Sequence, residues 1–389
     1  MRILHFVQSI SDIHGSFFYL KKQHALLNQY GIEQYYLSYE KNQVDYKNEL
    51  ESISDYIYLL DNHTISDLLH KTIKPDIIHF DDVYSSYIIN KSNKHQYFYE
   101  LCKDMITVRT VHDYSSLVCP KFLTQGEKTY CDKPINKACL SKKCIHIDDY
   151  EMYKAYLNSL KRYDGLFYFS NNIYSIMRDM TIDETKLFKL PPLISRPHTY
   201  SYVSDKVILF AGRLVPQKGI AYLLKAMARM NLRDWKLIIA GTCDKSYFRK
   251  LMSLANTLEI QHNVRFVGHL PQQELFQYLS KVRVMAFPSI GHETYGFSGA
   301  EAIAYGVPVI AFDIEGIDEW LIEGITGMKV PIKDIDAYAQ AMESLLTDDM
   351  IYKQYRENCI QWSGQLQLEE QTKILYSHYV NIYNKSKKN

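Results

Sequence analysis

Short β-rich segments alternate with amphipathic helical segments along most of this chain, and this alternation limits the folds that it can adopt. Where strands alternate with helices, the strands are expected to run parallel in a sheet that helices cover on both faces. The strands predicted in the first half are Arg2–Val7, Gln34–Ser38, Tyr56–Leu60, Asp76–Phe80, Ile106–Val111 and Gly165–Phe169. Those predicted in the second half are Lys206–Phe210, Lys236–Ala240, Val264–Phe266, Arg283–Phe287 and Val307–Ala311.

Prolines interrupt the alternation between these two series. Pro191-Pro192 and Arg196-Pro197 stand at the break, and the segment that continues to Asp205 is typical of a linker. A chain of 389 residues is also longer than one hydrophobic core comfortably supports. We therefore predict an α/β fold with two Rossmann-like parallel-sheet domains, residues 1–195 and 205–365, and a cleft between them. A C-terminal helix in residues 366–389 is expected to pack back on the first domain.

The composition is that of an ordinary globular protein. Hydrophobic residues make up 47% of the chain and charged residues 23%, and the net charge of +1 does not indicate nucleic acid as a partner. No apolar run approaches the length of a membrane span, and Met1–Val7 is typical of a first strand rather than of a secretion signal. We expect a soluble, cytoplasmic protein.

A predicted strand ends at Gly212, and two cations, Arg213 and Lys218, precede the next predicted helix. This arrangement suits phosphate, because glycine lets the backbone approach, arginine offers a bidentate fork and lysine adds a mobile charge. The alternative is a solvated loop whose basic side chains face water.

A second segment places two carboxylates, Glu293 and Glu301, on either side of a glycine-bearing loop that leads into a helix. Backbone N–H groups and the positive end of the helix would lie beside acceptors for hydroxyl groups, which suits a ligand with phosphates and polyols such as a nucleotide-sugar. Two alternatives remain open. Ser298-x-x-Glu301 also fits a capping box, and Glu293 could be an ordinary loop carboxylate.

Together and in this order, the two segments resemble the family-4 retaining glycosyltransferases of the GT-B fold, and the resemblance covers nearly the whole chain. The strongest motif is the Glu-x7-Glu run from Glu293 to Glu301, in which Glu293-Thr294-Tyr295-Gly296 matches the family's Glu-x-aromatic-Gly. The segments that follow it are also close to the family pattern: Glu301-Ala302-Ile303-Ala304-Tyr305-Gly306-Val307-Pro308, Gly316-Ile317-Asp318-Glu319-Trp320-Leu321 and Glu323-Gly324-Ile325-Thr326-Gly327.

The resemblance implies roles for these residues in the second domain, which would bind the nucleotide-sugar donor. Arg213 and Lys218 would clamp the donor diphosphate and stabilise the leaving nucleoside diphosphate, after the turn at Gly212. Glu293 would hold hydroxyls of the donor sugar, and Glu301 would bind the ribose. The remaining contacts would come from the N–H groups of Tyr295, Gly296 and Phe297 and from the base-contacting turn at Gly268. Catalysis of this kind needs no bound metal.

The first domain would supply the acceptor side. Thr110-Val111-His112-Asp113-Tyr114 resembles the family's His-Asp element, so His112 would contact the donor sugar or position the acceptor. A satisfied structural histidine is the alternative reading. Gly15 stands where the family has paired glycines after the first strand, and it would contact phosphate or acceptor.

Four of the seven cysteines cluster in an insertion, about residues 115–148, that follows the His-Asp element: Cys119, Cys131, Cys139 and Cys144. Four thiolates could hold structural zinc, although the spacing has no tight Cys-x2-Cys pair. Two disulfides, which a cytosolic location disfavours, and free thiols are the alternatives. The insertion is also rich in lysine, which suits an anionic acceptor or the inner face of a membrane, or simply a solvated loop.

The sequence therefore predicts a retaining hexosyltransferase that uses a nucleoside-diphosphate sugar and acts on a glycan or lipid-linked acceptor, in bacterial surface polysaccharide synthesis. A front-face mechanism, in which the leaving phosphate takes the acceptor proton, would explain retention. A nucleotide-sugar epimerase or hydrolase of the same fold and a catalytically silent scaffold subunit are the alternatives. A nicotinamide-dependent dehydrogenase is disfavoured because no Gly-x-Gly-x-x-Gly follows the first strand.

Overall fold

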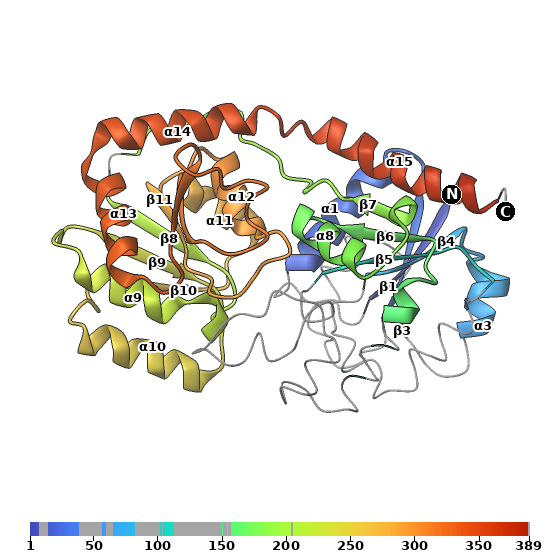
Figure 1. The fold of residues 1–389 in the computed structure, drawn as a ribbon, viewed down its shortest axis with the longest axis horizontal. Helices are drawn as coiled ribbons and strands as arrows, with labels where there is room; N and C mark the ends of the chain where they lie inside the picture. Colours follow the sequence, from blue (N-terminus) through green and yellow to red (C-terminus); the bar gives the residue numbers. More distant parts are fainter. Residues whose placement is uncertain are drawn as a thin grey trace. The chain divides into compact units, whose positions relative to one another are not determined.

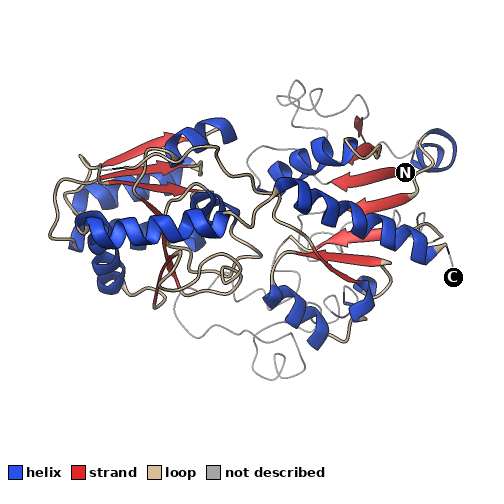
Figure 2. Ribbon diagram, turned by 90° about the horizontal axis from the view of Figure 1, so that it is seen from above, coloured by secondary structure: helices blue, strands red, loops and turns tan. Residues whose placement is uncertain are grey.

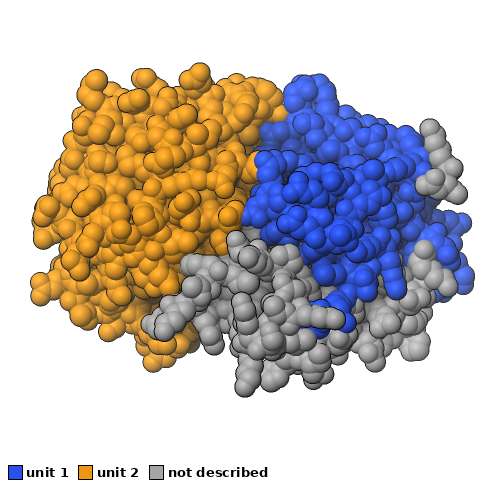
Figure 3. All heavy atoms as spheres, viewed as in Figure 1, with its two compact units in different colours: residues 1–193, 369–389 blue, residues 194–368 orange. Residues whose placement is uncertain are grey.

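The chain folds into two compact units, and Figure 3 colours them separately. Unit 1 consists of Met1–Leu193 and Glu369–Asn389, and unit 2 is Ile194–Leu368. This computed structural model describes residues 1–7, 15–38, 57–59, 65–81, 102, 104–112, 150, 154, 157–203 and 205–387.

Unit 1 is built on a parallel sheet with strand order β3-β2-β1-β4-β5-β6-β7. Its inner strands are buried along almost their whole length, as expected where helices cover both faces of a parallel sheet. The strands are β1 (Arg2–Val7), β2 (Glu33–Ser38), β3 (Ile57–Leu59), β4 (Ile77–Phe80), β5 (Thr107–Thr110), β6 (Gly165–Tyr168) and β7 (Leu187–Lys189). The described α-helices are α1 (Gly15–Asn28), α3 (Ile65–Asp67), α8 (Asn171–Asp179) and α15 (Leu368–Ser386).

Helix α15 comes from the far end of the chain but packs within unit 1, beside α1 and β7 (Figure 1). The hydroxyl of Tyr379 accepts a hydrogen bond from Gln23 Nε2 of α1 at 3.0 Å and lies 2.6 Å from His79 Nδ1 of β4. Nε2 of His378 lies 2.9 Å from the carbonyl oxygen of Lys189. Tyr379 is fully buried, so α15 contributes to the core of unit 1.

Unit 2 holds a second parallel sheet, with strand order β10-β9-β8-β11-β12-β13, and helices on both of its faces (Figure 2). The strands are β8 (Val207–Ala211), β9 (Lys236–Ala240), β10 (Val264–Gly268), β11 (Val284–Phe287), β12 (Val309–Phe312) and β13 (Gly327–Val330). The helices are α9 (Ile220–Arg229), α10 (Lys245–Thr257), α11 (Gln272–Leu279), α12 (Phe297–Ala304), α13 (Ile335–Thr347) and α14 (Asp349–Ser363).

Every strand predicted from the sequence is present, with ends displaced by no more than two residues. The prediction missed two short edge strands, β7 and β13. Within the described part of the chain, each helix lacks the length or the apolar character that crossing a bilayer requires.

Candidate functional site

The turn after β8 and the loop after β11 lie against each other in unit 2, and Gly219 permits this approach. Gly219 has φ +69°, and a Cβ atom built on it would lie 1.8 Å from the carbonyl oxygen of Pro288. The Ile290 N–H donates to the Gln217 carbonyl oxygen at 2.9 Å, which joins the same two segments. Lys218 is thereby held next to the loop that follows β11.

Lys218 and Glu293 form an ion pair in this place. The Nζ of Lys218 lies 2.5 Å from Oε1 of Glu293, and the side chains are 23% and 17% exposed. Ser289 donates its hydroxyl to the same carboxylate oxygen at 2.7 Å and is itself buried. The structure therefore brings together two residues that the sequence assigned to one site, and it adds Ser289, which the sequence reasoning missed.

A network of close contacts fixes the loop that carries Glu293. The Glu293 N–H donates to the Glu315 carbonyl oxygen at 3.1 Å. Gly316 has φ +89°, and a Cβ atom there would lie 1.5 Å from the carbonyl oxygen of Glu293. Further along the loop, Trp320 Nε1 donates to the carbonyl oxygen of Tyr295 at 2.5 Å. Both the backbone and the side chain of Glu293 are therefore held in place.

Helix α12 begins at Phe297, with Gly296 as its N-cap at φ +79° and without a side-chain cap. Ser298 is therefore already inside the helix, so the capping-box interpretation of Ser298 and Glu301 is wrong. Oε1 of Glu301 instead accepts a hydrogen bond from Gln272 Nε2 at 3.2 Å. Glu301 thus lies on the first turns of α12, beside the start of α11.

The N-termini of α9 and α12 differ from those of three other helices in unit 2, α10, α13 and α14. Each starts after a left-handed glycine, Gly219 or Gly296, that offers no side-chain acceptor to the first N–H groups. By contrast α10, α13 and α14 are each capped by an aspartate carboxylate, at Asp244, Asp334 and Asp348. The helix starts beside the Lys218–Glu293 pair therefore keep positive ends that can serve an anion.

The other predicted donor residues also lie at the carboxyl edge of this sheet. A Cβ atom on Gly241 would lie 1.9 Å from the Gly212 carbonyl oxygen, and the Gly241 N–H donates to the Gly268 carbonyl oxygen at 2.6 Å. Gly241 thus links the ends of β8, β9 and β10. Arg213 follows Gly212, and it is exposed to solvent. Tyr295 is buried, which raises the pKa of its hydroxyl.

In unit 1 the structure describes two of the predicted site residues. Gly15 is the first residue of α1. His112 follows β5, its side chain is 5% exposed, and its Nε2 lies 3.6 Å from Oδ1 of Asp81. Asp113 lies outside the described residues. So do the four cysteines proposed to bind zinc: Cys119, Cys131, Cys139 and Cys144.

Asp81 is the centre of a buried histidine cluster that the sequence did not reveal. It follows β4, is 2% exposed, and its Oδ2 lies 2.7 Å from Nδ1 of His5 while its Oδ1 lies 3.2 Å from Nε2 of His79. Burial opposes ionisation of Asp81, but the facing histidines outweigh it and lower the pKa of this carboxyl. Burial lowers the pKa of His79 to about 3, so its ring is neutral near pH 7.

His5, His79 and Asp81 are close enough together to be considered as metal ligands, with ligand atoms within 4.8 Å of one another. Hydrogen bonds nevertheless engage both ring nitrogens of His79. Its Nδ1 lies 2.6 Å from the Tyr379 hydroxyl and its Nε2 lies 2.7 Å from Thr110 Oγ1. Coordination through Nε2 would break the Thr110 contact, so a hydrogen-bonded network accounts for the cluster without a metal ion.

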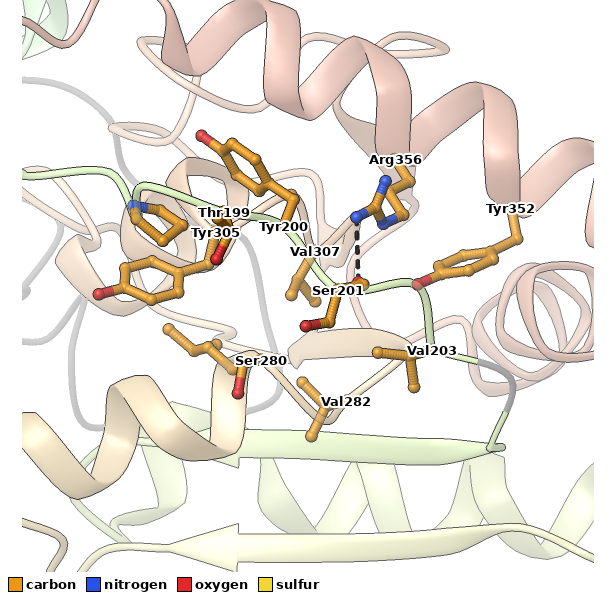
Figure 4. A pocket seen from close by; sticks show the side chains of 13 residues that line it. Thr199, Tyr200, Ser201, Val203, Ser280, Val282, Tyr305, Val307, Tyr352 and Arg356 are labelled. Carbon is orange, nitrogen blue, oxygen red and sulfur yellow. Dashed lines mark hydrogen bonds between the residues drawn. The ribbon is translucent and has the colours of Figure 1, made fainter.

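A small cavity of about 20 Å³ lies elsewhere in unit 2, under the segment that leads from unit 1 (Figure 4). Arg356 of α14 donates to the carbonyl oxygen of Ser201 at 3.0 Å and holds this segment in place. The cavity has room for about one water molecule. It contains none of the predicted site residues, and we regard it as a packing gap of the linker.

Comparison with known proteins places these observations in a family context. The family model described as "Glycosyl transferases group 1" matches residues 195–362, a span that includes Lys218, Glu293 and Glu301. The D-inositol 3-phosphate glycosyltransferase of Corynebacterium diphtheriae is 35% identical over 150 residues, which are 37% of this chain and 35% of that protein. The chain spans about a third of the length of the first curated relatives that it matches.

Two further proteins resemble a larger part of the chain. An uncharacterized 41.2 kDa protein in cps region of Klebsiella pneumoniae is 25% identical over 273 residues, 70% of this chain and 69% of that protein. The structure of Anabaena HepE in complex with UDP and glucose superposes with a TM-score of 0.75 at 14% identity, over 98% of this chain and 100% of that one. With the two parallel sheets, this likeness confirms the predicted α/β fold of the GT-B class.

Proposed function

We propose that this chain is a glycosyltransferase that moves a hexose from a nucleoside-diphosphate sugar to a hydroxyl of a glycan or lipid-linked acceptor, with retention at the anomeric carbon. The observation that carries the proposal is the Lys218–Glu293–Ser289 cluster, which lies beside the uncapped start of α12. The group 1 match over residues 195–362 supports it, because that span contains the whole cluster.

In this proposal the donor diphosphate lies over the turn between Gly212 and Gly219. Arg213 and Lys218 supply the positive charge, and the open N-termini of α9 and α12 add N–H donors. Donor binding would exchange the Lys218–Glu293 contact for one between Lys218 and phosphate and one between Glu293 and sugar hydroxyls. Ser289 keeps the Glu293 carboxylate in place during that exchange, because it holds the same oxygen.

The remaining donor contacts come from the loop and helix that follow Glu293. The N–H groups of Tyr295, Gly296 and Phe297 would approach sugar and phosphate, and Glu301 would bind the ribose hydroxyls. Gln272, which already donates to Glu301, would share the ribose or the base with the turn at Gly268. The bond from the anomeric carbon to the diphosphate oxygen breaks as the bond to the acceptor oxygen forms. The acceptor proton passes to the leaving phosphate. Arg213 and Lys218 would balance the charge that develops there, in place of a metal ion.

Unit 1 would serve the acceptor side, with His112 contacting the donor sugar or positioning the acceptor and Gly15 contacting phosphate or acceptor. We further propose that the four clustered cysteines bind structural zinc. We also propose that the protein acts at the inner face of a bacterial membrane. The setting would be surface polysaccharide synthesis, in keeping with the cps region named for the Klebsiella relative.

The first experiment asks which donor binds. Thermal shift against nucleoside diphosphates and their sugars should raise the melting temperature for one base, because a ligand at 100 times its Kd stabilises the folded state by about 2.7 kcal/mol. Absence of any shift would contradict the donor site. Donor turnover without acceptor would instead favour the epimerase or hydrolase.

The second experiment tests the residues. Glu293→Gln and Lys218→Met should each lower kcat/KM for the matched donor at least about 100-fold, which corresponds to about 2.7 kcal/mol of transition-state stabilisation. Lys206→Met is a matched control. Lys206 forms a 2.7 Å ion pair with Asp234 at the amino-terminal ends of the strands, whereas the site lies at their carboxyl ends. This variant should stay within about two-fold of wild type. Full activity in both site variants would refute the assignment.

A further inference from the structure

The buried carboxylate of Asp81 has no part in the donor chemistry proposed above, yet several polar side chains of unit 1 surround it. The side chains of Tyr36, His5 and His79 stand in register on three adjacent strands, β2, β1 and β4. The His5 ring stacks on Tyr36 with centroids 4.9 Å apart and lies 5.2 Å from the His79 ring. Helices α1 and α15 cover this polar row with Gln23 and Tyr379.

The hydrogen bonds in this row indicate which ring nitrogen of His79 carries the hydrogen. Gln23 Nε2 donates to the Tyr379 hydroxyl, which can in turn donate its hydrogen to Nδ1 of His79. The hydrogen of the neutral His79 ring then resides on Nε2, which faces Thr110 Oγ1 at 2.7 Å and Asp81 Oδ1 at 3.2 Å. On the other side, His5 presents Nδ1 to Asp81 Oδ2 at 2.7 Å. His5 thus lies within hydrogen-bond distance of the carboxylate, whereas the Nε2 hydrogen of His79 is bonded to Thr110 and lies close to Asp81.

His112 is the third imidazole around Asp81, and its side chain is the least enclosed of the three. Its Nε2 lies 3.6 Å from the Oδ1 atom that His79 also faces, and its ring centroid is 5.9 Å from that of Phe169. A carboxylate at this distance favours the ring orientation and the tautomer that put N–H on Nε2. When the ring is neutral, Nδ1 is then its hydrogen-bond acceptor.

We propose that Asp81 is a positioning residue: held by His5 and His79, its carboxylate fixes the ring orientation and the tautomer of His112. This inference rests on the proposed function, in which His112 meets the sugar or the acceptor. Asp81 would therefore determine which ring nitrogen of His112 carries the hydrogen. The hydrogen bonds that link Gln23, Tyr379 and His79 hold the His79 ring beside Asp81.

A double-mutant cycle tests the inference. Asp81→Asn keeps the size of the side chain and removes its charge, and it should lower kcat at least about 10-fold, with a smaller change in the donor KM. In a His112→Ala background the same change should alter kcat by less than about two-fold, because Asp81 acts through His112. Equal effects of Asp81→Asn in both backgrounds would overturn the inference, since a purely structural loss is additive.

Asp164→Asn is the matched control for this cycle. Asp164 precedes β6 and so lies at the amino-terminal ends of the strands, whereas Asp81 follows β4 at their carboxyl ends. Oδ2 of Asp164 accepts a hydrogen bond from the Thr107 N–H at 2.8 Å. The substitution makes the same chemical change to a hydrogen-bonded carboxylate in unit 1. It should leave kcat within about two-fold of wild type while lowering the melting temperature. A loss of kcat that matches that of Asp81→Asn would overturn the inference, because it would reduce both effects to loss of stability.

A spectroscopic measurement judges the inference without any activity. Long-range ¹H–¹⁵N spectra of histidine-labelled protein, with His112 assigned by a His112→Gln variant, report the tautomer of the ring. The His112 signals should show the hydrogen on Nε2 in wild type and a mixture of tautomers in Asp81→Asn. Unchanged signals would overturn the inference even if the enzyme transfers sugar. If wild type neither binds nucleotides nor transfers sugar, the proposed function fails, and the spectra still decide the Asp81–His112 pairing. Zinc that is present in wild type and lost in Asp81→Asn would also overturn it.

Discussion

Acidification should destabilise unit 1 through His79, and the magnitude follows from its burial. The side chain of His79 is fully buried, and burial lowers its pKa from 6.5 to about 3. Between these two values the unfolded chain binds a proton that the folded chain rejects, so stability falls as the pH decreases. The slope is about 1.4 kcal/mol per pH unit, and the loss reaches about 2 kcal/mol at pH 5 relative to pH 7.5.

Neighbouring groups do not reverse this sign. Burial also lowers the pKa of His24, to about 4, and that of His378, so both add to the loss on acidification. Asp81 has a lowered pKa and therefore stabilises the fold above the ordinary range of a carboxyl. Its contribution begins to fall only below about pH 4. At pH 5 the lowered pKa values of His79, His24 and His378 therefore set the sign of the change.

The assay compares wild type with His79→Gln by urea denaturation at pH 7.5 and pH 5.0. The variant is less stable at both pH values, but its loss between them should be smaller by about 2 kcal/mol. The three tryptophans, Trp235, Trp320 and Trp362, all belong to unit 2, so their fluorescence does not report on unit 1. Hydrogen exchange of peptides from β4 and α15, corrected for the intrinsic rate, supplies the local signal. Equal pH dependence in the two proteins would refute the reasoning.

Two further predictions concern the loop that carries Glu293. Gly316→Ala should cost at least about 2 kcal/mol of stability and weaken donor binding, because its φ is +89° and a Cβ would lie 1.5 Å from the Glu293 carbonyl oxygen. Thermal melting and donor titration measure both effects, and unaltered values would contradict the contact. Trp320→Phe leaves the buried carbonyl oxygen of Tyr295 without its donor and should cost about 1–3 kcal/mol. Urea denaturation followed by the remaining tryptophans tests this, and a change below about 0.5 kcal/mol would show that the bond is dispensable.

The sequence predicts the fold well because the periodic signal is strong where both faces of a strand are buried. In β4 all four residues are buried, and the sequence there is almost uniformly apolar. The edge strands carry a weaker signal. β7 has three half-buried residues, and β13 contains a glycine and a lysine within four, so neither stands out from a loop. Their pairing with a neighbour makes them strands, and that pairing is not local information.

The candidate site divides in the same way. Lys218 and Glu293 were predicted from a motif, and they are in contact because Gly219 and Gly316 allow the backbones to approach. Ser289 could have been suspected, since a polar residue at the carboxyl end of a buried strand is typical of a site.

The histidine cluster of unit 1 could not be predicted from the sequence. His5 and His79 look like isolated polar residues within apolar strands. Only the register of β1 against β4 shows that they are partners.

The place of α15 has a consequence for the order in which the units can mature. Tyr379 and His79 are bonded to each other although 300 positions separate them along the chain. During synthesis β4 therefore leaves the ribosome long before its partner exists, and the whole of unit 2 is made in between. All strands of unit 2 are synthesised before α15, so until then the buried histidines of unit 1 lack the helix that covers them. Its completion is a late event, governed by the return of a distant helix rather than by its own first residues.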